Sequence, residues 1–294
     1  MDPLELVKLA QLMKRSSGRP EVKIGLIDGP VALDHPDLST ANIRSLPGKL
    51  RASCVEPTST ACVHGTFVAG ILCSVRNSSA PAICPNCAIL VRPIFAEGSP
   101  GNKELPSTTP EELAMAITEC VDAGATVINL SSALPPASSM AQRNLEQALA
   151  YAAKRGTLIV AAAGNHGMIG SSTITQHQWV LPVVACDRRG RPTSQSNLGA
   201  SIGRRGLSAP GYEITSLGVG GKLVSLGGTS AATPFVTGTI ALLASEFPGA
   251  TPAQIKLAIT QGASPRRNAI VPPLLNAWAA YEAMVTSSRR SVNA

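Results

Sequence analysis

Three residues far apart in the chain carry the side chains needed to activate a hydroxyl group: Asp28, His64 and Ser230. An imidazole can take the proton of a serine hydroxyl, and a carboxylate can hold the ring's tautomer and stabilise its charged form. Ser230 follows a turn of small residues and precedes the apolar run 235–243, which predicts a loop opening into a buried helix. On this segment alone, a helix cap is the alternative interpretation, because capping is the commoner use of serine there.

Asn165 extends this set, because its side-chain amide can donate a hydrogen bond to an oxyanion. It follows an apolar strand predicted over residues 157–163. The backbone N–H groups at the start of a helix lack intrahelical partners and favour a developing anion. We therefore expect Asn165 and the Ser230 N–H to form an oxyanion hole.

The elements that would position these residues alternate between apolar strands and helices. Strands are predicted over residues 22–28, 88–95, 125–131, 157–163, 180–186, 207–209 and 222–226. Helices are predicted over residues 1–15, 110–122, 140–155, 230–246, 252–261 and about 273–285, with a further helix beginning at His64. Near-continuous apolar strands with short connections are typical of a mostly parallel sheet with helices on both faces. The sequence therefore predicts one α/β domain, in which strand ends and helix starts meet at one edge.

Composition and charge narrow the function classes. The chain has 294 residues, 44% hydrophobic and only 3% aromatic, with a formal net charge of +7. Its basic pairs are scattered and have no interleaved aromatic residues, so we expect a solvated face and no nucleic-acid partner. Charged residues interrupt the apolar positions of the N-terminal helix, and no run reaches the length of a membrane span. These features predict a cytoplasmic protein with no membrane partner, and they leave its oligomeric state open.

Seven cysteines are present, and five of them cluster in one region: Cys54, Cys62, Cys73, Cys84 and Cys87. The last two have the C-x-x-C spacing of redox or zinc sites. A zinc site would need two further ligands that the chain does not offer at a matching spacing, and a thioredoxin-like motif would follow a strand, whereas this one precedes a strand. We expect a structural role, with a local disulfide as one option and the pairing left open. We expect no metal or other cofactor, although the sequence leaves a calcium site from loop oxygens open.

The segments around the three reactive residues resemble the subtilisin family of serine peptidases. The order Asp, His, Ser, in the motifs at residues 28–30, 64–70 and 228–234, is the order of that family. Residues 162–165 resemble its oxyanion segment. The resemblance covers about residues 20–285. It implies a subtilisin-like peptidase domain over residues 20–286, flanked by a helical extension over 1–19 and a flexible tail over 287–294.

The resemblance also implies where a peptide substrate would bind. Substrate would lie extended and add a strand along Leu130, Ser131, Ser132 and Ala133. Ala162, Ala163 and Gly164 would form one wall of a roomy, apolar pocket for the residue before the cut, and Thr229 would line the same cleft. The expected reaction is acyl transfer from a peptide to water.

Within this family, residues 26–31, 84–97 and 207–211 are most similar to the patellamide-type proteases of cyanobactin maturation. In such pathways one protease removes the leader of a precursor peptide, and another macrocyclises it with the help of a helical insertion between Asp and His. The stretch over residues 29–63 is too short for that insertion, so the resemblance implies hydrolysis of the leader-removing type. A general intracellular peptidase and a non-catalytic peptide-binding module are the alternatives.

Two departures from the family pattern are visible. Phe67 stands where many members carry a second histidine, which predicts a change in packing only. Gly29 and Pro30 follow Asp28 in place of a hydroxyl residue, which predicts one missing hydrogen bond to the aspartate. The other histidines have no assigned chemistry: we expect His35 in a turn and His166 in a surface loop.

Overall fold

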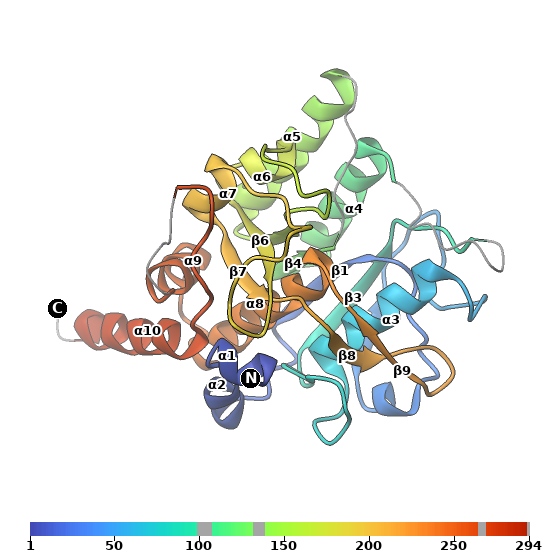
Figure 1. Cartoon of the computed structure of the whole chain (residues 1–294), viewed down its shortest axis with the longest axis horizontal. Coiled ribbons are helices and arrows are strands. Elements are labelled where there is room, and N and C mark those ends of the chain that lie inside the picture. The colour runs from blue at the N-terminus through green and yellow to red at the C-terminus, as the bar shows by residue number, and fades with distance from the viewer. Residues whose placement is uncertain (99–107, 132–138, 264–268, 293–294) are drawn as a thin grey trace.

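The computed structural model describes residues 1–98, 108–131, 139–263 and 269–292 of the chain (Figure 1). At its centre lies a seven-stranded sheet in the order β2-β3-β1-β4-β5-β6-β7, and all its paired strands are parallel. The strands are β1 (Lys23–Asp28), β2 (Asn42–Ser45), β3 (Ala88–Pro93), β4 (Val127–Leu130), β5 (Leu158–Ala162), β6 (Val180–Cys186) and β7 (Leu207–Pro210). The predicted single α/β domain with a parallel sheet is confirmed.

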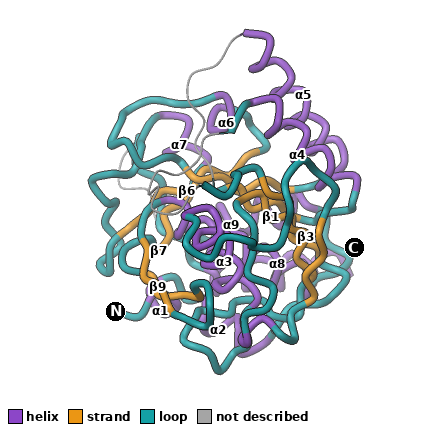
Figure 2. Tube along the Cα trace, turned by 90° about the vertical axis from the view of Figure 1, so that its right-hand side faces the viewer, coloured by secondary structure: helices purple, strands orange, loops and turns teal. Residues whose placement is uncertain are grey.

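Helices cover both faces of this sheet. One face packs against α4 (Pro110–Asp122) and α5 (Ser139–Arg155), which run side by side in both views (Figures 1 and 2). The other face packs against α3 (Thr60–Cys73) and α8 (Thr229–Glu246). Successive side chains of a strand point to opposite faces, so Leu26 on β1 lies in the core under α8 while Ile27 lies in the core under α4.

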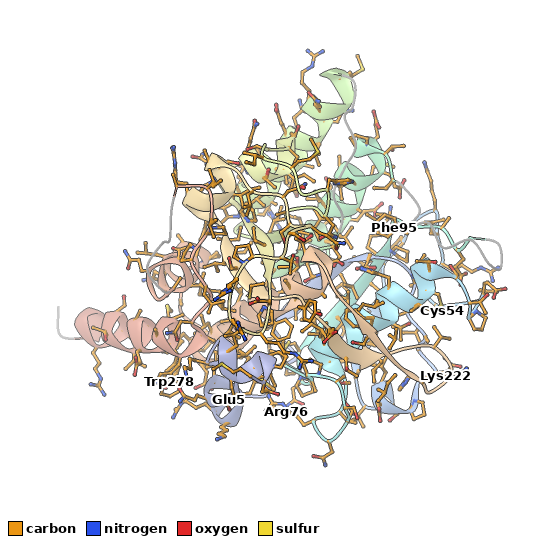
Figure 3. The ribbon with its side chains drawn as sticks, viewed as in Figure 1. Glu5, Cys54, Arg76, Phe95, Lys222 and Trp278 are labelled. Atoms are coloured by element: carbon orange, nitrogen blue, oxygen red, sulfur yellow. A yellow bond between two sulfur atoms is a disulfide. The ribbon has the colours of Figure 1, made fainter. Side chains whose placement is uncertain are left out.

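The N-terminus departs from the single helix predicted over residues 1–15. It forms α1 (Pro3–Leu6) and α2 (Leu9–Arg15), because Lys8 adopts a left-handed backbone conformation with φ 55°. This break buries Val7 and lets its carbonyl accept a hydrogen bond from Ala277 N, at the start of α10 (Ala277–Val292). Figure 3 shows Glu5 of α1 and Trp278 of α10 on this side of the molecule. The expectation of one continuous helix is wrong, since the chain turns at Lys8 between two short helices.

Three further features differ from the sequence-based expectation by more than small shifts of strand and helix ends. α3 begins at Thr60, so His64 lies in its second turn and not at its start. α10 runs to Val292, so residues 287–292, expected as a flexible tail, continue the helix. The strand predicted at 222–226 is β9 (Leu223–Leu226), which pairs with β8 (Ile214–Leu217) in an antiparallel hairpin outside the main sheet.

Three short helical elements and one longer helix complete the fold. The short ones are the 3-10 turn η1 (Pro36–Leu38), α6 (Thr173–Gln176) and α7 (Ala200–Arg205), and the longer one is α9 (Pro252–Gln261). α9 has the bounds that the sequence predicts, because Thr251 and Gln254 form a capping box and Pro252 occupies the first turn. None of the helices in the described part of the chain combines the length and apolar character needed to cross a membrane.

Candidate active site

Asp28, His64 and Ser230 form one continuous hydrogen-bonded relay. His64 Nδ1 lies 2.7 Å from Asp28 Oδ1, and His64 Nε2 lies 2.9 Å from Ser230 Oγ. All three side chains are buried or nearly so. Both ring nitrogens are therefore engaged, one by a carboxylate and one by a hydroxyl, which is the arrangement needed for a base to take the serine proton.

Asp28 lies at the end of β1, and the turn after it has room only for a glycine at position 29. Gly29 N donates to Asp28 Oδ1 at 2.7 Å. A Cβ atom at Gly29 would lie 2.0 Å from the carbonyl oxygen of Ala61, in the first turn of α3. The missing side chain therefore lets α3 pack directly on the turn after Asp28, and this contact brings His64 over the carboxylate.

Asp28 also has an oxygen without a partner. Its Oδ2 is buried, and no donor among the described residues reaches it. The residue pair after Asp28 supplies no hydroxyl, and Pro30 has no N–H. The sequence predicts that Asp28 lacks one hydrogen bond, and the partnerless Oδ2 agrees with this prediction.

Burial and charge act in opposite directions on His64. Burial of the ring lowers its pKa, but the charge of Asp28 and the hydrogen bond to Asp28 raise it, so the pKa of His64 lies above its ordinary value. The protonated ring is therefore stabilised in place by the carboxylate, as a proton carrier in acyl transfer requires.

Asn165 is held close to Ser230 by Thr229, the residue before the serine. Its Oδ1 accepts hydrogen bonds from Thr229 N at 2.8 Å and Thr229 Oγ1 at 3.1 Å. Because these bonds occupy the amide oxygen, the NH₂ end of Asn165 is the end that can donate to an anion. Thr229 is fully buried and also accepts from Gly164 N at 3.2 Å. Its side chain therefore contacts Asn165 and Gly164 and holds these two residues against the start of α8.

The other residues expected to bind substrate lie at the ends of two adjacent strands. Leu130 ends β4 and pairs in register with Ala161 of β5, and Ala162, Ala163 and Gly164 continue from there to Asn165. Ser131 is 8% exposed. Ser132 and Ala133 lie outside the described residues.

Sequence reasoning missed two residues next to this site. Asn129 and Thr237 are fully buried and bond to each other at 2.8 Å, and Asn129 Nδ2 donates to Ser131 Oγ at 2.8 Å. A visible signal was the recurrence of threonine every four residues in the otherwise apolar segment that begins at Thr229.

The remaining aromatic candidates take no part in the relay. Phe67 is buried in the core, consistent with a packing role. His35 caps η1 by accepting from Asp37 N at 3.1 Å, so it is a turn residue as predicted. His166 is exposed in the loop after Asn165. Burial, followed by the charges of Lys256 and Arg205, lowers the pKa of His177.

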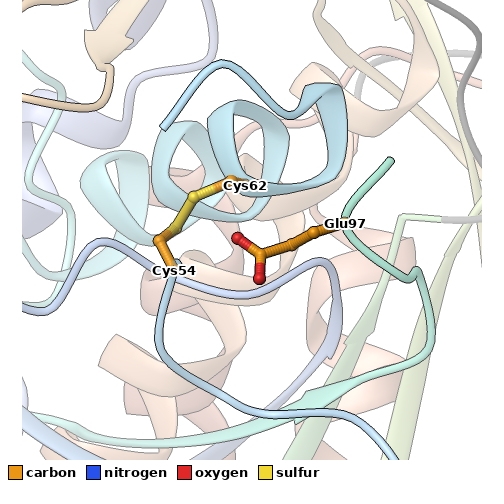
Figure 4. Close-up of side chains that lie close together, drawn as sticks. All are labelled: Cys54, Cys62 and Glu97. Carbon is orange, nitrogen blue, oxygen red and sulfur yellow. A yellow bond between two sulfur atoms is a disulfide. The ribbon is translucent and has the colours of Figure 1, made fainter. Parts of the chain in front are cut away.

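A disulfide joins Cys54 to Cys62, two residues before His64 on α3 (Figures 3 and 4). Glu97 lies beside it and accepts from Val55 N and Glu56 N at 2.7 and 2.8 Å. Among the described residues, these two sulfur atoms and the Glu97 carboxylate are the group with metal-ligand spacing. Because the two sulfur atoms are bonded to each other, they offer no thiolate ligand. The two C-x-x-C cysteines are buried free thiols.

Comparison with known protein sequences gives consistent matches over most of the chain. A model of the subtilase family matches residues 19–278. A thermophilic serine proteinase of Bacillus sp. strain AK1 is 35% identical over 253 residues, which are 85% of this chain and 57% of that protein. A thermostable alkaline protease of Halalkalibacterium halodurans is 33% identical over 68% of this chain and 52% of its own length. The chain thus spans little more than half the length of these two relatives. Thermitase of Thermoactinomyces vulgaris is 32% identical over 81% of this chain and 79% of its own.

Solved structures of proteases also match over most of the chain. The prenylagaramide maturation protease PagA superposes with a TM-score of 0.83 at 30% identity, covering 94% of this chain and 98% of that chain. A mutant of the protease domain of PatA superposes with a TM-score of 0.82 at 31% identity, covering 92% and 97%. The PatG macrocyclase domain reaches a TM-score of 0.83 at only 21% identity, which shows a shared fold and no more.

Proposed function

The chain belongs to the subtilase family, and from this premise we propose that it is a serine endopeptidase that acts through Asp28, His64 and Ser230. The observation that carries the proposal is the unbroken relay, with 2.7 Å between Asp28 and His64 and 2.9 Å between His64 and Ser230. A carboxylate, an imidazole and a hydroxyl at these separations are within reach for proton transfer.

The proposed reaction proceeds in two halves. Ser230 Oγ attacks a peptide carbonyl carbon while its proton passes to His64 Nε2, and the Asn165 amide with the Ser230 N–H stabilises the oxyanion. The C–N bond then breaks as His64 gives the proton to the leaving amine. In the second half His64 takes a proton from water, the hydroxide attacks the acyl carbon, and the carboxylic acid leaves as Ser230 regains its proton.

We further propose that the substrate is a ribosomally made precursor peptide, from which the enzyme cleaves the leader. PagA and PatA, which match 92–94% of this chain at 30–31% identity, are both maturation proteases. Between Asp28 and His64 the described chain holds only η1, β2 and the first turn of α3. A shielding helical insertion would need more chain there, so water can reach the acyl-enzyme and hydrolysis is favoured over macrocyclisation.

A peptidase of broad specificity is the second candidate, and the curated relatives favour it. Thermitase and the thermophilic serine proteinase of Bacillus sp. strain AK1 are 32–35% identical to this chain and carry general protease names. A non-catalytic peptide-binding module has no such support, because every member of the relay is present at bonding distance.

The two candidates differ in how many bonds they cut. The test is mass spectrometry of the products released from casein and from a diverse peptide library, with the Ser230→Ala variant as the blank. A few cuts that share one sequence pattern support a maturation protease. Cuts at many unrelated sites in casein support the broad peptidase and overturn leader removal. No cleavage of either substrate beyond the Ser230→Ala blank overturns the peptidase proposal itself.

A further inference from the structure

Three threonines recur every four residues along α8, starting at its first residue: Thr229, Thr233 and Thr237. Residues four apart lie on one face of a helix, and all three of these side chains are fully buried. Thr233 Oγ1 donates to Thr229 O at 2.7 Å, and Thr237 Oγ1 lies 3.2 Å from Thr233 O. The face of α8 that begins beside Ser230 is therefore a ladder of hydroxyl groups inside an otherwise apolar core.

Both ends of this threonine ladder bond outside the helix. At the top, Thr229 N and Oγ1 donate to Asn165 Oδ1. Two turns lower, Thr237 Oγ1 donates to Asn129 Oδ1 at 2.8 Å. Asn129 lies on β4 and passes the connection on, since its Nδ2 donates to Ser131 Oγ at 2.8 Å. One helix thus carries the nucleophile and bonds to both the oxyanion donor and the end of β4.

Burial of the Asn129 amide costs free energy unless its hydrogen bonds are formed. The amide is fully buried, and a buried amide must find hydrogen-bond partners. An apolar pair of the same shape could fill this space with little loss of stability. Packing of that kind leaves the end of the strand free to shift along the helix, whereas two directional hydrogen bonds hold it at one position.

We propose that Thr237 and Asn129 are positioning residues that hold Ser131 in a fixed place relative to Ser230. This inference rests on the proposed function, because Ser131 belongs to the segment beginning at Leu130 along which a peptide substrate is expected to extend. Neither Thr237 nor Asn129 bonds to the relay. They act on the reaction by setting the distance and angle between a bound peptide and the attacking hydroxyl.

A positioning role separates two reactions of the same serine. A fluorophosphonate reacts by forming an Oγ–P bond as the P–F bond breaks and the serine proton passes to His64. This small reagent needs the relay and the oxyanion hole but no extended peptide segment. Cleavage of a peptide needs all three. Loss of the Thr237–Asn129 connection should therefore slow peptide turnover and spare labelling.

The experiment compares Thr237→Val, Thr237→Ser and Thr239→Val with the wild-type chain. Valine keeps the shape of threonine and removes the hydroxyl, and serine restores it. Thr239 is the matched control, because it is equally buried on the same helix and its hydroxyl donates to Phe235 O at 2.7 Å within that helix. For each variant we measure kcat and KM on one cleaved peptide, the rate of fluorophosphonate labelling and the thermal unfolding curve.

We expect Thr237→Val to lower kcat about tenfold to hundredfold with little change in KM, since small displacements of reacting groups have effects of this size. Its labelling rate should stay at the wild-type value, Thr237→Ser should recover kcat, and Thr239→Val should keep it. Unchanged kcat in Thr237→Val, or a labelling rate that falls in step with kcat, overturns the positioning role.

A second variant and the wild-type control cover the outcomes in which Thr237→Val alone gives no answer. If Thr237→Val does not fold, Ser131→Ala removes the other end of the connection by the loss of a single hydroxyl group, and wild-type peptide turnover in that variant overturns the proposal. If the wild-type chain neither labels nor cleaves, the proposed function fails and the positioning role fails with it. Wild-type labelling and cleavage with no effect of Thr237→Val removes the positioning role alone.

Discussion

Gly65, the residue after His64, packs directly on the backbone of Gly29, the residue after Asp28. A Cβ atom at Gly65 would lie 2.5 Å from Gly29 O and 2.4 Å from Pro30 O. Where α3 crosses the end of β1, Gly65 thus lies against the backbone of Gly29, and Gly29 lies against the backbone of Ala61. These contacts, in addition to the hydrogen bond between the side chains, set the distance between the carboxylate and the imidazole.

Gly65→Ala should therefore damage both stability and activity. The new methyl group meets backbone oxygens that cannot rotate away, so α3 must move off the turn, at a cost of about 1–3 kcal/mol of unfolding free energy. The same movement displaces His64, and kcat/KM should fall by about tenfold or more. Chemical denaturation and peptide cleavage measure the two effects. Gly249→Ala is the control, because a Cβ there meets no atom within 4 Å; equal effects of the two substitutions would contradict the argument.

The pH dependence should report the raised pKa of His64. The ring must be neutral to act as a base, so kcat/KM should rise with pH, with a midpoint above the ordinary histidine value of about 6.5. Stability should change in the opposite direction. Because the folded pKa exceeds the unfolded one, His64 contributes stability that is fully present below about pH 6.5 and is lost as pH rises through the folded value.

The measurement is a pH–rate profile together with denaturation curves at several pH values, for the wild type and for His64→Ala. The variant should lose the part of the stability slope that lies above about pH 6.5. A midpoint of kcat/KM below that value would mean that burial of the ring outweighs its attraction to Asp28.

Asn165→Ala should lower kcat by about 10²–10³-fold with little change in KM, because an oxyanion donor acts mainly in the transition state. Thr229→Val should have a smaller effect of the same kind. It removes the hydroxyl that holds Asn165 Oδ1 but keeps the Thr229 N–H bond to the same oxygen. Steady-state kinetics on one peptide measures both variants. A rise in KM at constant kcat would assign Asn165 to substrate binding and not to oxyanion stabilisation.

The main sheet could be predicted from the sequence because its central strands are almost wholly apolar. β6 has the bounds that its apolar run predicts, and β1 differs by one residue. β2 has no such signal, since its residues are polar or half-exposed at the sheet edge. The break at Lys8 was equally hidden, because it depends on the burial of Val7 against α10.

The convergence of Asp28, His64 and Ser230 could be predicted because each stands next to an apolar run and has a side chain with few other uses there. Asn129 and Thr237 lacked that distinction. Asparagine in a strand and threonine in a helix have many neutral roles, and only the tertiary packing of α8 on β4 shows that the two side chains bond to each other. Thr229 illustrates the same limit, since its contact with Asn165 crosses 64 residues of chain.

The Cys54–Cys62 disulfide closes a short loop with a sequence separation of 8, immediately before His64 on α3. In the chain-entropy account such a loop stabilises the folded state by about 2–3 kcal/mol. Reduction should therefore lower the free energy of unfolding by that amount. The loop should stay partly in place, because Val31 N donates to Ala52 O and Cys54 N donates to Val31 O. Glu97 adds bonds to the next two backbone N–H groups (Figure 4). Activity should accordingly fall less than stability.

Chemical denaturation with and without dithiothreitol tests this prediction, with the Cys54→Ser/Cys62→Ser double variant alongside. The double variant should match the reduced wild type and show no response to reductant, while Cys120→Ala, which removes a buried free thiol on α4, should keep the full response. A response of the double variant to reductant would place the sensitivity at another pair of cysteines.

In the cytoplasmic location expected from the sequence, reduced thiols would prevail. The chain must then keep α3 in place through Glu97 and the Val31 bonds, and Glu97→Ala should destabilise the reduced protein more than the oxidised one.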